Sequence, residues 1–179
     1  SNPVGNLVQG ADGALYGVSS PATSITGGVI YRTTLDGSDV RTLYQLKPED
    51  ALSPAGGLVL ASDGLLYGTT KFGQAGQVDG AGSIFKLAAA GTGFQIIHRF
   101  APVTASNQDL NPINTNGAYP EAELVEGADG YLYGVARAGG PNGTGTIFKI
   151  SRDGTDFQLL HSFAAVTSSS TSGLTVTVD

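Results

Sequence analysis

The chain has 179 residues and a formal net charge of −6, and it contains 27 glycines, 8 prolines and no cysteine. With only 13% charged residues, this composition favours short strands and turns over long solvated helices. The missing cysteines exclude disulfides, thiolate metal sites and cysteine nucleophiles. The acidic charge balance without basic clusters argues against nucleic-acid binding, and no apolar run approaches the length that crosses a bilayer.

One pattern occurs three times along the chain. The phrase Asp-Gly-x-Leu-Tyr-Gly starts at Asp12, Asp63 and Asp129, and a proline stands at the same distance before it, at positions 3, 54 and 120. A second phrase follows, Ile-Tyr-Arg at 30–32 and Ile-Phe-Lys at 84–86 and 147–149, and it precedes Leu46, Phe100 and Phe163 by a constant interval. The constant spacing predicts a rigid repeated unit with copies at 3–46, 54–100 and 120–163.

Each copy predicts four short strands arranged as two hairpins. In the third copy, residues 124–125 and 132–135 flank the turn at Asp129-Gly130, and residues 146–150 and 157–163 flank the turn at Asp153-Gly154. Asp-Gly pairs suit tight hairpin turns, and the flanking apolar residues alternate as in a half-buried strand. The Gly-rich loops between the hairpins vary in length, and residues 101–119 form an insertion that offers a contact surface.

The expected fold class is therefore all-β, with three four-stranded antiparallel propeller-like blades over residues 1–163. Residues 164–179 are expected to form a Ser/Thr-rich spacer and an extra C-terminal strand, whose apolar face carries Leu174, Val176 and Val178. Recurrence at identical strand positions predicts a repeat core made of Leu15, Tyr16, Leu66, Tyr67, Leu132, Tyr133, Phe85, Phe148, Phe100 and Phe163.

The repeated phrases Asp-Gly-x-Leu-Tyr-Gly, Gly-x-Ile-Phe-Lys and Leu-His-x-Phe resemble the GloVer-type (choice-of-anchor) tandem repeat of bacterial extracellular proteins. The resemblance extends to Phe163 and implies export and propeller-like β structure, but no chemistry. The first copy departs from the pattern, because Tyr31-Arg32 replaces Phe-Lys and Tyr44-Gln45-Leu46 replaces His-x-Phe.

Comparison among the copies weakens each catalytic interpretation. His98 and His161 occupy equivalent positions, but the first copy has Tyr44 there, which favours a structural role over acid–base catalysis. The three repeated aspartates precede glycine and are interpreted as turn formers. Asp79 is a carboxylate that could help to bind calcium, but a single carboxylate is too few to predict a calcium site. No catalytic residue, metal or cofactor is expected, and the possible ligand or contact residues are Phe72, Tyr119 and Arg137 in the variable loops.

Three blades leave sheet faces and edges uncovered, since closed propellers have 4–8 blades. We therefore expect a non-enzymatic structural protein that self-associates into a homo-oligomer or polymer through sheet edges and its C-terminal strand, forming a filament, a tube or a closed pair. The rival explanation of the uncovered edges is that the chain is a fragment of a longer protein. The alternative function is a lectin-like module that binds a glycan through its variable loops. With no signal segment in the chain, the mature protein is expected outside the cell or at its surface, without membrane insertion.

Overall fold

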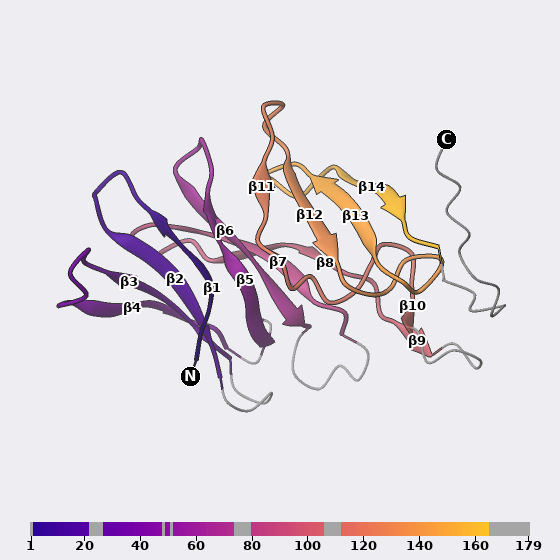
Figure 1. Cartoon of the computed structure of the whole chain (residues 1–179), viewed down its shortest axis with the longest axis horizontal. Helices are drawn as coiled ribbons and strands as arrows, with labels where there is room; N and C mark the ends of the chain where they lie inside the picture. The colour runs from indigo at the N-terminus through magenta and orange to yellow at the C-terminus, as the bar shows by residue number, and fades with distance from the viewer. Residues whose placement is uncertain are drawn as a thin grey trace, which may run out of the picture.

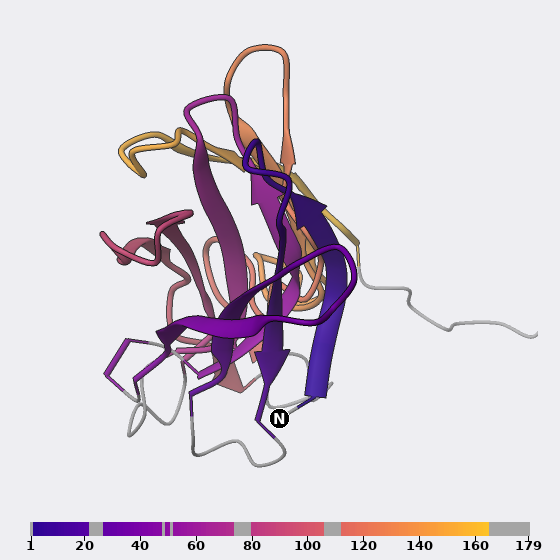
Figure 2. The same ribbon diagram turned by 90° about the vertical axis from the view of Figure 1, so that its left-hand side faces the viewer.

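The computed structural model describes residues 2–21, 27–47, 49–50, 52–73, 80–105 and 112–164. In these residues the chain forms strands and turns, and no helix is long and apolar enough to cross a membrane. Figure 1 shows three sheets side by side in chain order, and Figure 2 shows them from the side of the first sheet. This arrangement confirms the predicted all-β fold with three four-stranded propeller-like blades.

Each sheet contains four antiparallel strands that are hydrogen-bonded in chain order. The first sheet consists of β1 (Asn2–Gln9), β2 (Leu15–Ser20), β3 (Val29–Thr33) and β4 (Val40–Gln45). The second consists of β5 (Leu52–Leu60), β6 (Leu65–Phe72), β7 (Ser83–Ala88) and β8 (Gln95–Arg99). The third consists of β11 (Val125–Glu126), β12 (Leu132–Ala136), β13 (Thr146–Ile150) and β14 (Phe157–Ser162).

Two features depart from a simple threefold repetition. β11 has two residues, whereas β1 has eight and β5 has nine, so the first strand of the third sheet is short. The insertion before the third sheet contains a small hairpin of β9 (Thr104–Ala105) and β10 (Pro112–Ile113).

All three sheets have a β-bulge at the same position of the repeat. The pairing of the third and fourth strands shifts register between the Ile and the aromatic residue of the second repeated phrase. The shift falls at Ile30/Tyr31, Ile84/Phe85 and Ile147/Phe148. The constant spacing to Leu46, Phe100 and Phe163 therefore includes one bulge per sheet.

The Asp-Gly turns are built as the sequence predicts. Gly13, Gly64 and Gly130 have φ angles of 77°, 79° and 77°, a region in which glycine has no steric penalty. The preceding aspartate accepts a backbone N–H two residues further on, at distances of 3.2, 3.0 and 3.2 Å. These contacts fix the first hairpin of every sheet.

The hydrophobic core lies between the sheets. One buried cluster fills the contact between the first and second sheets, and another fills the contact between the second and third. The second sheet is therefore covered on both faces, while the described residues cover the first and third sheets on one face each.

Candidate functional site

The contacts between neighbouring sheets use the same repeat positions, and we call each contact a joint. At each joint the tyrosine of the repeated phrase on the preceding sheet is buried with two leucines and a phenylalanine of the following sheet. The first joint contains Tyr16, Leu58, Leu66 and Phe85, and the second contains Tyr67, Leu124, Leu132 and Phe148. None of these eight residues is more than 2% exposed.

A flat aromatic stack also recurs at both joints. Tyr44 stacks on Phe94 with ring centroids 4.2 Å apart, and His98 stacks on Phe157 at 4.1 Å. Burial lowers the pKa of His98 to about 4, and Asn116 Nδ2 lies 3.2 Å from its Nε2 atom. A neutral imidazole thus replaces the phenol ring of the first copy, which supports a structural role for His98.

A glycine in the second hairpin of each following sheet completes the joint. A Cβ atom added to Gly91 would collide with the carbonyl of Leu43, and one added to Gly154 would collide with the carbonyl of Ile97. These close approaches require glycine because any side chain would separate the sheets.

The outer face of the first sheet, on which no other described sheet packs, presents the same positions, and we call it the leading face. Leu7 is 49% exposed, whereas its counterparts Leu58 and Leu124 are buried. Val40, the counterpart of Phe94 and Phe157, is 65% exposed. The leading face comprises Leu7, Leu15, Tyr31, Leu35, Gly37 and Val40, and nothing lies within 4 Å of a Cβ added to Gly37.

The uncovered face of the third sheet, the trailing face, presents the other half of a joint. Phe163, expected in the core, is 44% exposed, although its counterparts Leu46 and Phe100 are buried. The expectation fails for Phe163 because no described sheet lies beyond β14. Leu15 and Tyr133, also expected in the core, are partly exposed because each lies on an uncovered face. The trailing face comprises Val125, Tyr133, Val135, Leu160, His161 and Phe163.

The repeated aspartates have a second role besides forming turns. The hydroxyls of Tyr16, Tyr67 and Tyr133 donate to the aspartate four residues earlier, at 2.9, 2.7 and 2.8 Å. Burial and the hydrogen bond to the carboxylate raise the pKa of Tyr16 and of Tyr67. The constant spacing of four residues between the aspartate and the tyrosine could have predicted this hydrogen bond. Each carboxylate therefore binds the tyrosine of its own hairpin, and each also lies within 4.0 Å of a cationic side chain outside that hairpin.

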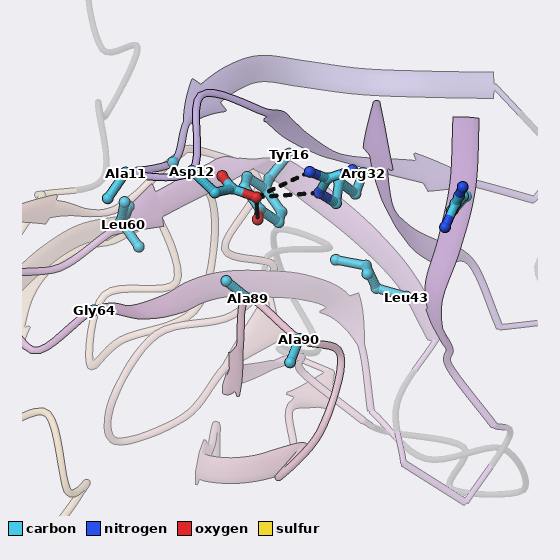
Figure 3. Close-up of a pocket in the computed structure, with 11 residues that line it drawn as sticks. Ala11, Asp12, Tyr16, Arg32, Leu43, Leu60, Gly64, Ala89 and Ala90 are labelled. Carbon is cyan, nitrogen blue, oxygen red and sulfur yellow. Dashed lines mark hydrogen bonds and ion pairs between the residues drawn. The ribbon is translucent and has the colours of Figure 1, made fainter. Parts of the chain in front are cut away.

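The first joint contains a groove of about 690 Å³ beside the hairpin turns (Figure 3). Arg32 lies on one wall and donates to Asp12 Oδ2 from Nε and Nη2, at 3.2 and 3.0 Å. Ala89, Ala90 and Leu60 also line the groove.

The second joint carries a polar network at the positions equivalent to this groove. Arg152 replaces Ala89, and its Nη1 donates to Ser62 Oγ at 2.7 Å and to Glu126 Oε1 at 3.2 Å. The repeat does not predict this network, because Ser62, Glu126 and Arg152 have no polar counterparts at the first joint. The equivalent residues there are Ala11, Leu60 and Ala89.

The three predicted loop residues lie together at the other ends of the strands. The rings of Phe72 and Tyr119 meet edge to face at 5.9 Å, and the Arg137 guanidinium lies 5.9 Å from the Tyr119 ring centre. Two further residues complete the group: Glu121 Oε1 lies 2.7 Å from Lys71 Nζ and 3.3 Å from Arg137 Nε. We call these five residues the loop cluster.

A cavity of about 360 Å³ adjoins the loop cluster. Lys71 and Glu121 line it together with Val4, Ser20 and Ser53. Tyr119 and its repeat counterpart Ser53 each precede the repeat proline, and each has a φ angle of 58°. This strained backbone is sterically costly for a bulky residue such as tyrosine.

Other expectations concern residues outside the described part of the chain. Leu174, Val176 and Val178 of the C-terminal strand lie there, as does Asp79. Within the described residues, no group of three or more His, Cys, Asp or Glu side chains could hold a metal ion.

Comparisons with known proteins agree with the architecture. The family model of the Gloeobacter/Verrucomicrobia repeat matches residues 1–179, and no curated protein matches the chain. Among solved structures, a chain of a nidogen/laminin complex is similar at 19% identity with a TM-score of 0.55, over 89% of this chain and 48% of that one. This chain therefore spans about half the length of that protein. A gluconolactonase from Xanthomonas campestris matches at 18% identity with a TM-score of 0.47, over 86% and 44% of the two chains.

Proposed function

The chain belongs to the Gloeobacter/Verrucomicrobia repeat family, and from that premise we propose that it is a non-enzymatic structural module that self-associates head to tail. The leading face of one copy packs on the trailing face of the next and forms a third joint. The supporting observation is that Leu7 on the leading face and Phe163 on the trailing face are exposed, while their counterparts at the two internal joints are buried.

The internal joints specify the contacts of this third joint. Tyr31 would take the place of Phe85 and Phe148 against Tyr133 of the next copy. Val40 would cover His161, as Phe157 covers His98, and Gly37 would approach Leu160. Burying one large apolar side chain contributes roughly 1.5–3 kcal/mol, so several such contacts are needed to exceed the cost of association, about 4–15 kcal/mol.

A head-to-tail contact joins two different surfaces, so repetition yields either a closed ring or an open filament. Of these assemblies we propose a filament or tube. The smallest possible ring would be a closed pair of two copies. The mass of the native particle separates these assemblies. We further propose an extracellular or cell-surface location, supported by the high glycine content and the low content of charged residues. Labelling of intact and permeabilised bacteria with an antibody tests the location.

Two charge variants test the third joint. Val40→Lys and His161→Glu each place an unpartnered charge in the proposed contact, and burial of an unpaired charge is costly. Each variant alone should show a lower mass than the native chain by light scattering. A 1:1 mixture should regain association because lysine then faces glutamate at one joint and the native pair forms at the other. Variants that associate like the native chain would contradict the proposal.

Two neighbouring leucines of β14 provide a matched control. Leu160 lies on the trailing face, and Leu159 pairs with Phe148 on the opposite face. Leu160→Ser should reduce association, whereas Leu159→Ser should leave it unchanged. Removing residues 173–179 measures the separate contribution expected of the C-terminal strand.

Glycan binding by the variable loops is the second candidate function. The observation that favours it is the gathering of Phe72, Tyr119 and Arg137 beside a cavity. Aromatic rings and planar polar groups are the usual partners of small ligands in such sites. Titration of the chain with neutral and acidic oligosaccharides tests this function directly.

A further inference from the structure

The loop cluster carries more positive than negative charge. Lys71 and Arg137 contribute two positive charges, and both contact the same oxygen of Glu121, which contributes one negative charge. The chain as a whole has a net charge of −6, so this local excess runs against the general charge. The cluster therefore favours an anionic group over a neutral or cationic one.

The cations of the cluster remain accessible to a ligand. The side chain of Arg137 is 62% exposed and that of Lys71 is 34% exposed. Glu121 Oε1 is buried and forms no well-aligned hydrogen bond, although both cations lie near it. Lys71 Nζ is the nearer cation, and the contact of Arg137 with Glu121, from Nε at 3.3 Å, does not use the guanidinium edge in a two-bond contact. A planar carboxylate is the partner that such an edge binds best.

The aromatic residues add an apolar surface next to these charges. Phe72 and Tyr119 meet edge to face, which presents two ring surfaces at an angle. The adjoining cavity of about 360 Å³ lies near the lower end of the size of small-molecule sites, roughly 300–1,000 Å³. A sugar ring has an apolar face for an aromatic ring and hydroxyls for polar groups, and an acidic sugar adds the carboxylate.

We propose that the loop cluster binds an acidic saccharide, with the sugar ring on Phe72 and Tyr119 and its carboxylate on Arg137 and Lys71. This inference rests on the second candidate function and is independent of self-association. The contacts of the Tyr119 ring with Phe72 and Arg137 hold the ring in the cluster, so less ordering is needed on binding.

Calorimetric titration with oligogalacturonate and with a neutral oligosaccharide, maltohexaose, tests the proposal. The native chain should bind oligogalacturonate at least tenfold more tightly than maltohexaose, and added salt should weaken this binding. Arg137→Gln should weaken oligogalacturonate binding about tenfold, the loss expected for one charge-assisted contact. Arg41→Gln is the control, because Arg41 is equally an exposed, ion-paired arginine but lies on β4.

The outcomes separate the two levels of the proposal. Equal binding of both saccharides with no effect of Arg137→Gln would overturn the acidic class and leave glycan binding standing. Binding of neither saccharide would overturn both. An equal loss in Arg137→Gln and Arg41→Gln would show that general charge, and not the loop cluster, holds the acidic saccharide, and would overturn the assignment of the site.

Discussion

At the scale of single residues, the tyrosine of the repeated phrase connects each hairpin turn to the core. Its ring lies in or next to a joint, while its hydroxyl donates to the aspartate of the turn. The three copies place this bond in different surroundings: Tyr67 is fully buried, whereas Tyr133 lies on the trailing face. The same bond should therefore differ in its contribution to stability.

Tyr67→Phe should lower the free energy of unfolding by about 1 kcal/mol, because it removes a hydrogen bond from a buried ring. Tyr133→Phe should change it by less than roughly 0.5 kcal/mol, as is usual for exposed positions. Denaturant unfolding of the two variants measures the difference. Equal losses would show that burial does not decide the value of this bond.

His98 should make the stability of the chain depend on pH. Burial lowers its pKa from 6.5 to about 4 in the folded state. Between these values the unfolded chain binds a proton and the folded chain does not, so the free energy of unfolding falls as the pH is lowered. Since the ring is partly exposed, we expect this group to contribute a loss of about 1 kcal/mol.

His98→Tyr isolates this contribution, because Tyr44 forms the equivalent stack in the first copy. The variant should keep the stack, and its stability should change less between pH 6.5 and pH 4. Unfolding curves across this range, recorded for both chains, measure the slope. Parallel curves would exclude His98 as a source of the pH dependence.

At the scale of elements, the two joints share their apolar contacts and differ in polar ones. The second joint has the Arg152 network, and the first has a groove at the equivalent positions. The apolar part was predictable because it recurs in every copy. The network was not, because a residue found in one copy gives no repeat signal, and the contact of Arg152 with Ser62 spans 90 residues.

Arg152→Ala should lower the free energy of unfolding by about 1–2 kcal/mol, since its hydrogen bond to Ser62 links two sheets and its bond to Glu126 lies within the third. Arg41→Ala removes an exposed ion pair with Asp39 and should cost less than about 0.5 kcal/mol. Thermal or denaturant unfolding compares the two. A loss of similar size in both variants would mean that the network adds nothing to the second joint.

At the scale of the whole molecule, the three sheets differ in how many faces are covered. Amide hydrogen exchange should be slowest in β6 and β7 of the second sheet, because opening this sheet disrupts both joints. Self-association should slow exchange in β2 and β3, which carry residues of the leading face, and in β12 and β14, which carry residues of the trailing face. Exchange that slows elsewhere, with these strands unchanged, would contradict the third joint.

The sequence predicted the features that lie within one copy of the repeat, but not those that depend on a neighbouring sheet. The repeated phrases predicted the strands, the turns and the three sheets. They also predicted that equivalent residues would be equally buried, which failed for Phe163 because burial depends on the neighbouring sheet. Phe72, Tyr119 and Arg137 were predicted as separate loop residues, and their proximity depends on the packing of the second sheet against the third.

The equivalence of the two joints also bears on how such a gene can change. Since each following sheet brings the same apolar positions and the same hairpin glycine, an in-frame duplication of one copy would meet complementary contacts on both of its sides. The loss of the middle copy would similarly bring together two faces whose apolar positions match, although Arg152 and Glu126 would lose their partner Ser62. As far as the apolar contacts are concerned, one recombination event can therefore change the number of blades.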